Sequence, residues 1–283
     1  MFHLQPDRPA VMGVLNVTPD SFSDGDAYAS VGEAVDAARR MMDDGADLID
    51  VGGESTRPGA EPIPANEELR RVLPVIEGLV RGGVLVSVDT MKAVVARAAV
   101  EAGAEVVNDV SALRDPEMLG ALAGSDVSVC LMHMQGTPQT MQLEPHYADV
   151  VGEVRTMLTG TARRAEVAGV HRDRIWFDPG IGFGKTDAHN LALLANLNQL
   201  VETGYPVLIG VSRKGFLGRL LGGIGTHARL PGALAIQVLA QAEGVRIIRT
   251  HDVLETRQAI AVQTAIRARR ISDSSRRSRD EQP

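Results

Sequence analysis

The sequence predicts a single domain with the (β/α)₈ barrel fold, because a unit of helix, glycine and apolar strand recurs along the chain. Seven segments follow this order, and their glycines are Gly45, Gly83, Gly103, Gly124, Gly169, Gly204 and Gly244. Each glycine stands where a residue of left-handed conformation typically ends a helix. The apolar runs after them are short and nearly continuous, which is typical of parallel strands buried on both faces. The opening run AVMGVLN brings the strands to eight, and eight strands alternating with helices over about 250 residues describe this barrel.

Helices are predicted between these strands from capping residues and from apolar residues at helical spacing. Ser30 and Glu33 form a capping-box pattern, and an apolar stripe covers 31–42. Further helices are expected at 69–80, 93–102, 150–167 and 231–243. An open, doubly wound sheet is the alternative arrangement of the same elements. The barrel domain is assigned to residues 1–270, and the polar, charged stretch 271–283 is predicted to be a disordered tail.

Composition narrows the class of protein. The chain has 283 residues and a formal net charge of −7 without a dense basic stripe in its body, which argues against nucleic acid as a partner. No apolar run reaches the roughly 18 residues of a membrane span, and the N-terminus lacks a signal-peptide pattern. The single cysteine, Cys130, lies in an apolar run and is interpreted as a small buried side chain. We therefore expect a cytoplasmic protein that does not bind a membrane.

Polar residues follow the apolar runs at the ends of the predicted strands. In a (β/α)₈ barrel these carboxyl ends meet at one mouth, where the active site lies. The residues expected there are Asn16, Glu54, Asp89, Thr90, Asn108, Asp109, His133, Asp178, Ser212, Arg213, Lys214, Arg249, Thr250 and His251. Asp89, Asn108 and Asp178 offer acceptors that suit a heterocycle with N–H and amino groups.

The cationic residues of the predicted mouth suit a different part of a ligand. Lys214 can donate to a ring carbonyl. Arg249 and His251 lie two residues apart at the end of the last strand and suit an anionic group such as a diphosphate. Barrels often hold phosphates near their seventh and eighth strands. The expected ligand is therefore a polar fused ring that carries phosphate.

Two long polar loops leave the same face, at 16–30 and 52–66. Long loops in a compact domain are usually functional lids or disordered segments, and we favour lids. A third stretch, DPGIGFGKT, ends like a nucleotide-binding P-loop. Pro179 stands where that motif needs a glycine, and it has no N–H to offer a phosphate, so a P-loop is not expected. Lys185 in this stretch is expected to face solvent.

Several polar residues keep two interpretations. His133 closes the fifth strand, and either a structural role or a substrate contact fits. Thr90 and Asp109 are expected to be caps or supporting groups rather than direct ligands. Asp50 is a mid-strand carboxylate, which is unusual. Its role is left open, and a structural support of the mouth is one interpretation.

Eight motifs in register resemble the dihydropteroate synthase family of pterin-binding barrels. They are GVLNVTPDSFSDG, DVGGESTRPGA, SVDT, NDVSAL, LMHMQGTPQTMQ, DPGIGFGKT, GVSRKGFLGRLL and RTHDV, and they extend from about Val11 to Ala265. The resemblance implies a cytoplasmic (β/α)₈ barrel, usually a homodimer, that requires Mg²⁺. The implied reaction joins 6-hydroxymethyl-7,8-dihydropterin diphosphate to 4-aminobenzoate and yields 7,8-dihydropteroate and diphosphate.

The resemblance also implies roles for individual residues. Asn16 matches the metal-binding asparagine of the family. The positions that match pterin-binding residues are Asp89, Asn108, Asp178 and Lys214. Arg249 and His251 match diphosphate ligands. The positions that match loop and aminobenzoate-pocket residues are Phe22, Asp24, Thr56, Arg57, Phe183 and Ser212. Asp89, Asp178 and Lys214 are assigned the catalytic roles, with the two carboxylates stabilising a pterin cation that develops as diphosphate leaves.

Three positions depart from the family pattern, and none of them is a residue with an assigned chemical role. Asp26 replaces a glycine, Gly215 replaces a bulkier residue and Thr250 replaces a valine. Two alternative functions remain: a pterin-dependent methyltransferase barrel, and a paralogue that binds pterin without catalysis. The first predicts no SRK or RTHD anion site, and the second predicts loss of residues such as Asn16 or Lys214, but all of these are present.

Overall fold

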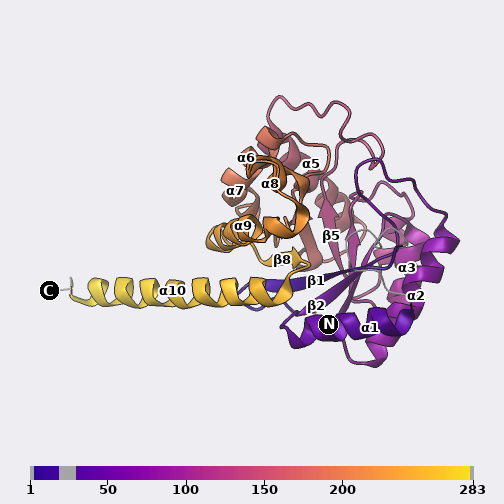
Figure 1. Ribbon diagram of the computed structural model, residues 1–283, viewed down its shortest axis with the longest axis horizontal. Helices are drawn as coiled ribbons and strands as arrows, with labels where there is room; N and C mark the ends of the chain where they lie inside the picture. The colour runs from indigo at the N-terminus through magenta and orange to yellow at the C-terminus, as the bar shows by residue number, and fades with distance from the viewer. Residues whose placement is uncertain (1–2, 19–29, 281–283) are drawn as a thin grey trace.

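Eight parallel strands form the centre of the molecule (Figure 1). The computed structural model describes residues 3–18 and 30–280, with side chains up to residue 269. The strands are β1 (Ala10–Asn16), β2 (Leu48–Gly52), β3 (Val86–Asp89), β4 (Val106–Asp109), β5 (Ser128–Met132), β6 (Ile175–Asp178), β7 (Leu208–Gly210) and β8 (Ile247–Thr250). Their order is β6-β5-β4-β3-β2-β1-β8-β7, and a parallel bridge between Phe177 and Val207 links the two ends. The sheet is therefore a nearly closed barrel, which confirms the (β/α)₈ prediction over the open sheet.

Helices surround the barrel between the strands. They are α1 (Val31–Asp43), α2 (Ala65–Arg81), α3 (Ala93–Glu101), α4 (Met118–Leu122), α5 (Val150–Val167), α6 (Asp187–Ala195), α7 (Leu197–Val201), α8 (Gly215–Leu220), α9 (Leu230–Ala242) and α10 (Val253–Asp280). Short 3₁₀ turns occupy Arg172–Arg174 and Thr226–Arg229. Figure 1 shows α10 leaving the barrel as a long projection. Because its backbone continues to Asp280, it enters the predicted tail 271–283, whose disorder stays a prediction.

The local signals at the helix ends behave as predicted. The side chain of Ser30 caps α1 by accepting a hydrogen bond from the Glu33 N–H at 3.2 Å. The seven glycines that follow the helices all have positive φ angles, from 74° at Gly83 to 104° at Gly103. A residue with a side chain would be strained in that conformation, so the glycines permit each helix to end and the next strand to begin.

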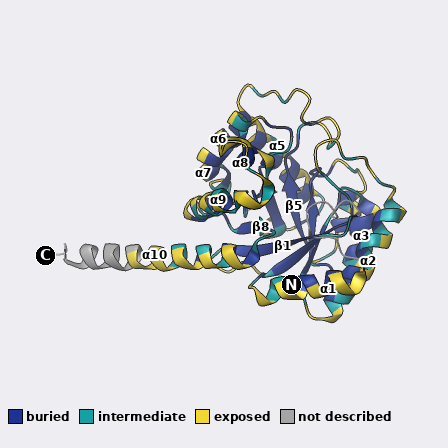
Figure 2. Cartoon of the chain, in the orientation of Figure 1, coloured by how far each residue is buried: buried dark blue, intermediate teal, exposed yellow. Residues whose placement is uncertain are grey.

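The barrel interior separates into an apolar base and a polar mouth. Most of the strand residues are buried (Figure 2). The base is a cluster of inward side chains: Ala10, Met12, Leu48, Val106, Cys130, Trp176, Leu208 and Ile247. Side chains alternate along a strand, so the next inward positions stand two residues further toward the carboxyl end. Those positions hold Asp50 after Leu48 and Arg249 after Ile247, and the change from apolar to charged residues begins there.

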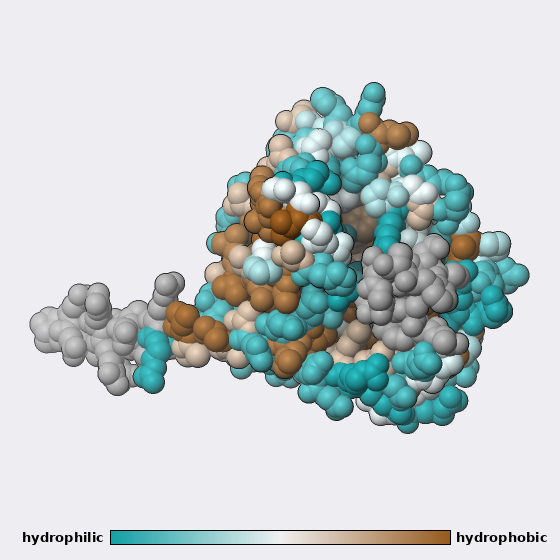
Figure 3. All heavy atoms as spheres, viewed as in Figure 1, coloured by the Kyte–Doolittle hydropathy of each residue, from teal (hydrophilic) through white to brown (hydrophobic). Residues whose placement is uncertain are grey.

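The outer surface carries apolar residues on some helices. Figure 3 shows a mostly hydrophilic face with hydrophobic side chains gathered over the region of α8 and α9. The exposed apolar residues of α8, α9, α10 and the turn after α8 are Leu220, Leu221, Leu239, Leu254, Val262 and Ile266. Among the helices of the described residues, none has both the length and the apolar character to span a bilayer.

Candidate active site

Side chains from four strands form one hydrogen-bonded group at the carboxyl end of the barrel. Arg249 on β8 donates from Nε to Asp50 Oδ2 on β2 at 2.6 Å, and from Nη2 to Asp89 Oδ2 on β3 at 2.8 Å. Asn108 on β4 donates from Nδ2 to Asp50 Oδ2 at 3.0 Å. The structure therefore brings together three residues that the sequence predicted for this site, around a fourth that it left unassigned.

Asp50 is that fourth residue, and its side chain is fully buried. Its second oxygen, Oδ1, has no hydrogen-bond partner among the described residues, and neither has Oδ1 of Asn108. Buried acceptors are rarely left unpaired in folded proteins. Two such acceptors at the base of the mouth would be satisfied by a ligand that presents N–H or amino groups.

Burial also changes the protonation of Asp89. Loss of solvent raises the pKa of this carboxyl group to about 7, and the negative charges of Asp50 and Glu68 add to the rise. The guanidinium of Arg249 opposes it. The carboxyl group is thus poised between its two protonation states near neutral pH, a condition often found at functional sites.

Asp178 on β6 occupies the opposite side of the mouth with Lys214 and Phe183. Asp178 accepts a hydrogen bond from the Gly180 N–H at 2.7 Å, while burial raises the pKa of its carboxyl group. Burial lowers the pKa of Lys214 to about 8; Arg249 adds to that shift, and Asp178 and Asp89 oppose it. The Lys214 ammonium lies 4.0 Å from the centre of the Phe183 ring, in a cation–π contact.

The expectation that Lys185 faces solvent is wrong. Only 2% of this residue is exposed. Its ammonium contacts His133 Nδ1 at 3.1 Å, and it donates to the backbone oxygens of His133 at 3.2 Å and Phe183 at 2.9 Å. The loop after β6 turns back under the end of β5, so the lysine satisfies carbonyl groups that would otherwise be buried without donors. His133 is likewise buried, and burial lowers the pKa of its ring to about 3.

The loops after β7 and β8 are joined by a second polar group. Ser212 Oγ lies 3.1 Å from Asp252 Oδ2 and 3.1 Å from His251 Nδ1. Asp252 also accepts a hydrogen bond from Arg213 Nη2 at 3.1 Å. Arg213 has a φ of 60°, an uncommon conformation for a residue with a side chain. Thr250 accepts a hydrogen bond from the Asp252 N–H at 3.1 Å, so this departure from the family pattern supports the same group.

The predicted metal residue Asn16 ends β1, next to Gly52 of β2 and near Asp89 of β3. A Cβ atom built on Gly52 would lie 3.5 Å from both Asn16 Oδ1 and Asp89 Cβ, so the absence of a side chain at position 52 leaves these neighbours close. The described residues contain no cluster of three or more histidine, cysteine or acidic side chains that could hold a metal ion. The Asn16 amide oxygen would suit a Mg²⁺ ion, which prefers oxygen ligands and usually needs only one or two from the protein.

The second predicted lid packs against the β5 loop. The Gly59 N–H donates to Pro138 O at 3.0 Å, and Gln139 donates to Glu61 at 3.0 Å. Thr56 and Arg57 lie on this loop, and the positive charge of Arg57 contributes to lowering the pKa of His251. The first predicted lid, with Phe22 and Asp24, falls mainly outside the described residues.

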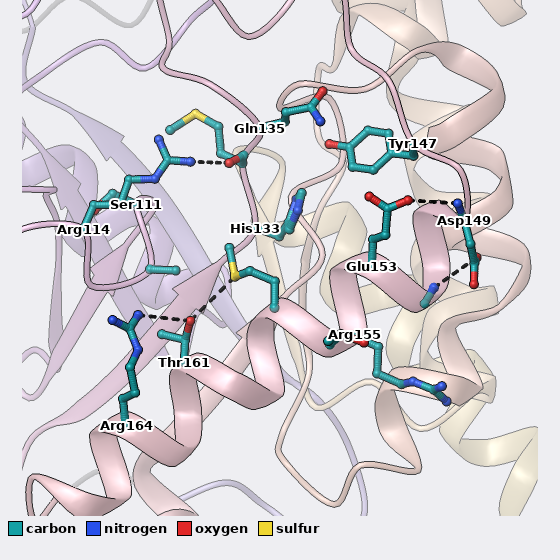
Figure 4. A pocket seen from close by; sticks show the side chains of 15 residues that line it. Ser111, Arg114, His133, Gln135, Tyr147, Asp149, Glu153, Arg155, Thr161 and Arg164 are labelled. Carbon is teal, nitrogen blue, oxygen red and sulfur yellow. Dashed lines mark hydrogen bonds between the residues drawn. The ribbon is translucent and has the colours of Figure 1, made fainter.

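An open hollow of about 850 Å³ lies to one side of the mouth (Figure 4). It is bordered by the loop after β4, the loop after β5 and helix α5, with Arg114, His133, Tyr147 and Glu153 among its residues. Neither the Asp50–Arg249 group nor Asp178 or Lys214 lines it. We therefore place the candidate active site at the barrel mouth and not in this hollow.

Comparisons with known proteins show which family the chain resembles. A family model described as pterin binding enzyme matches residues 12–251. The dihydropteroate synthase of Escherichia coli K12 is 48% identical over 260 residues, which cover 92% of each chain. Among solved structures, the Xanthomonas albilineans dihydropteroate synthase with 4-aminobenzoic acid is 50% identical, with a TM-score of 0.86 and coverage of 93% and 94%. The Burkholderia cenocepacia dihydropteroate synthase complexed with 7,8-dihydropteroate is 44% identical, with a TM-score of 0.87 and 96% coverage of both chains.

Proposed function

The chain belongs to the dihydropteroate synthase family of pterin-binding enzymes, and we propose that it catalyses the reaction for which that family is named. The reaction joins 6-hydroxymethyl-7,8-dihydropterin diphosphate to 4-aminobenzoate and releases 7,8-dihydropteroate and diphosphate. The observation that carries this proposal is the mouth itself, where buried acceptors on β2, β4 and β6 and a partly buried one on β3 face cationic groups on β8 and on the loop after β7.

In this proposal the carboxylate side of the mouth binds the pterin ring. Asp89, Asn108 and Asp178 accept hydrogen bonds from its N–H and amino groups, and Lys214 donates to its carbonyl oxygen. The unpaired Oδ1 atoms of Asn108 and Asp50 support this role, because a ring rich in donors satisfies them. Arg249 then exchanges part of its contact with Asp89 for the substrate.

The diphosphate group lies beside Arg249 and His251. Asn16 would hold a Mg²⁺ ion at this point, and the ion supplies positive charge beside the diphosphate oxygens when bound. Phe183, Ser212, Thr56 and Arg57 shape the pocket for 4-aminobenzoate, and Phe22 and Asp24 close the first loop over the substrates.

The chemical step is loss of diphosphate from the methylene group of the pterin. The electron-rich ring delocalises the cation that develops, and Asp89 and Asp178 stabilise it electrostatically. Arg249 stabilises the departing anion, and the closed loops exclude water that would capture the cation. The amine of 4-aminobenzoate then attacks the methylene carbon, so no covalent enzyme intermediate is needed.

The two other functions are less consistent with the residues at the mouth. A pterin-dependent methyltransferase would not need the cationic residues on β8 and after β7, and a non-catalytic paralogue would have lost some of them. Asn16, Lys214 and Arg249 are all retained. The relatives are dihydropteroate synthases over nearly their whole length, which favours the transferase.

A cytoplasmic homodimer completes the proposal. A single, buried cysteine suits a reducing compartment. The exposed apolar side chains of α8, α9 and α10, among them Leu239 and Val262, are a surface that a second copy would cover. Light scattering of the wild type and of Leu239→Glu tests the dimer; a monomeric wild type would contradict it.

The deciding experiment mixes purified protein with the pterin diphosphate, 4-aminobenzoate and Mg²⁺ and measures dihydropteroate by chromatography. Product formation above a no-enzyme control supports the proposal, and its absence refutes it. Asp178→Asn serves as the negative variant, because it removes a carboxylate while keeping the shape of the side chain.

A further inference from the structure

The protonation state of His251 can be read from its neighbours. Burial lowers the pKa of this ring well below its ordinary value, and the positive charges of Arg213, Arg249, Lys214 and Arg57 lower it further. The free site therefore holds a neutral imidazole near pH 7. A neutral imidazole has one N–H and one bare nitrogen, and its hydrogen bonds decide which is which.

Ser212 determines which ring nitrogen carries the proton, because its hydroxyl has a single proton to donate. Its Oγ lies 3.1 Å from Asp252 Oδ2, 3.1 Å from His251 Nδ1 and 3.3 Å from the His251 backbone N–H. A carboxylate can only accept, so the Ser212 proton must go to Asp252. The Ser212 oxygen then accepts from the backbone N–H and from ring Nδ1 of His251, which requires the proton of the ring to be on Nδ1.

Asp252 is itself fixed in place, which keeps this direction of hydrogen bonding. Its other oxygen accepts from Arg213 Nη2 at 3.1 Å, and its backbone N–H donates to Thr250 Oγ1 at 3.1 Å. The loops after β7 and β8 are thus joined by the Ser212 hydroxyl and by the Arg213–Asp252 pair, and Ser212 is only 6% exposed. Nε2 of His251 has no hydrogen-bond partner among the described residues.

This arrangement alters the role that the sequence suggested for His251. A bare Nε2 cannot donate to a diphosphate oxygen, and the proton on Nδ1 is already engaged by Ser212. The ring can instead accept a proton at Nε2. Since the two nitrogens of an imidazole point in diverging directions, Nε2 is directed away from the Ser212–Asp252 pair.

We propose that Ser212 and Asp252 hold His251 with its proton on Nδ1, and that Nε2 takes the proton released when the amine of 4-aminobenzoate bonds to the pterin. This catalytic step rests on the proposed function. The C–O bond to diphosphate breaks and its electron pair leaves with diphosphate. The amine lone pair forms the C–N bond, and the resulting ammonium gives one proton to Nε2. His251 then passes that proton to the departing diphosphate and returns to its neutral form.

A weakly basic imidazole suffices for this transfer. An arylammonium is far more acidic than an alkylammonium, because the aromatic ring takes up the nitrogen lone pair once the proton leaves. Once protonated, Nε2–H becomes a donor to the diphosphate, so the contact with the anion forms as the leaving group departs. His251 acts on the reacting atoms, and Ser212 and Asp252 are positioning residues.

The tautomer is measured directly by NMR on full-length protein labelled with ¹⁵N in its histidine rings, with the His251 signals assigned by their loss in His251→Gln. We expect Nδ1–H in the wild type near pH 7. In Asp252→Asn the new amide can donate to Ser212 Oγ, which frees the Ser212 proton for Nδ1 and moves the ring proton to Nε2. Asp173→Asn is the matched control, because Asp173 contacts His171 on the surface, away from the mouth; it should leave the His251 signals unchanged.

Kinetics of the same variants test the proton transfer. Because positioned general bases contribute about 10²–10⁴-fold, we expect Asp252→Asn to lower kcat by about 10²-fold while both KM values stay within about threefold. Ser212→Thr keeps the hydroxyl and should restore most of the activity that Ser212→Ala loses; thermal melting identifies any variant that is unfolded.

A wild-type ring protonated on Nε2, or an Asp252→Asn variant with an altered tautomer and unchanged kcat, would overturn the proposal. Failure of the wild type to form dihydropteroate would instead refute the proposed function and leave the tautomer assignment intact.

Discussion

Arg249, which is partly buried, forms an ion pair with the fully buried Asp50, with Nε and Oδ2 2.6 Å apart, although 199 positions separate them in the chain. The pair joins β8 to β2 across β1, and the guanidinium extends the contact to Asp89 on β3. The cation that is expected to meet the diphosphate is thus oriented by a carboxylate at the base of the mouth.

Asp50→Asn should weaken both folding and pterin binding. Removing one partner of a buried ion pair costs about 3–5 kcal/mol, and the remaining contact with Asp89 reduces this to roughly 1–3 kcal/mol in the free energy of unfolding. Urea denaturation measures the loss. Titration calorimetry should show at least about tenfold weaker binding of pterin diphosphate, equivalent to about 1.4 kcal/mol.

The control for Asp50→Asn is Asp36→Asn, which removes a carboxylate from an exposed pair with Arg39. Exposed pairs contribute about 0–1 kcal/mol, so this variant should behave like the wild type. Equal effects of the two substitutions would show that the Asp50 contact neither stabilises the barrel nor orients Arg249.

The sequence predicted the barrel because its signals are local. A glycine after each helix and a continuous apolar run after each glycine can be recognised within a dozen residues, and all seven glycines adopt the expected conformation. The role of Asp50 was not predictable in that way. It depends on the pairing of β8 with β1, which brings Arg249 beside Asp50. The role of a mid-strand carboxylate cannot be predicted until such a partner from the other end of the chain is known.

The prediction that Lys185 faces solvent was wrong for a related reason. A lysine in a glycine-rich loop is exposed by default, since burial of an ammonium group is costly without partners. Here the partners are backbone oxygens of residues 133 and 183, and only the fold brings the end of β5 over the loop. The sequence shows the lysine, but it does not show that backbone oxygens from another part of the chain lie close enough to accept its hydrogen bonds.

Lys185→Met should therefore destabilise the protein and weaken pterin binding. Leaving buried carbonyl groups without a donor costs about 1–3 kcal/mol in the free energy of unfolding. The loop that carries Asp178 and Phe183 loses its attachment to β5, so the KM for pterin diphosphate should also rise. Arg219→Met removes an exposed cation that pairs with Asp187 and should have little effect. If the two variants behaved alike, the buried lysine would not hold the loop.

The same lysine predicts how stability depends on pH. Burial lowers the pKa of Lys185 from 10.5 to about 7. Between these values the unfolded chain binds more protons than the folded one, so this group makes stability rise as pH increases from 7 towards 10.5. The free energy of unfolding of the wild type relative to Lys185→Met should increase over that range. A constant difference between the two proteins would contradict the lowered pKa.

Phe183→Leu should discriminate between the two substrates. The variant removes the ring that packs 4.0 Å from the Lys214 ammonium, a contact worth about 0.5–2 kcal/mol. Because Phe183 is proposed to line the 4-aminobenzoate pocket, we expect KM for that substrate to rise about tenfold, and KM for the pterin to change less than about threefold. Steady-state kinetics with each substrate varied in turn measure both values. A larger effect on the pterin would place Phe183 in the other pocket.

Metal removal tests the role of Asn16. Chelation with EDTA should abolish dihydropteroate formation, and added Mg²⁺ should restore it, because the diphosphate then leaves beside a compensating positive charge. Asn16→Ala should raise the Mg²⁺ concentration for half-maximal activity by about 10–100-fold, the range seen when groups around a metal are removed. Asn198→Ala, an exposed asparagine of α7, is the matched control and should titrate like the wild type. Full activity of the chelated enzyme would refute the metal requirement. An unchanged Mg²⁺ titration in Asn16→Ala would keep the requirement and move the ligand away from the end of β1.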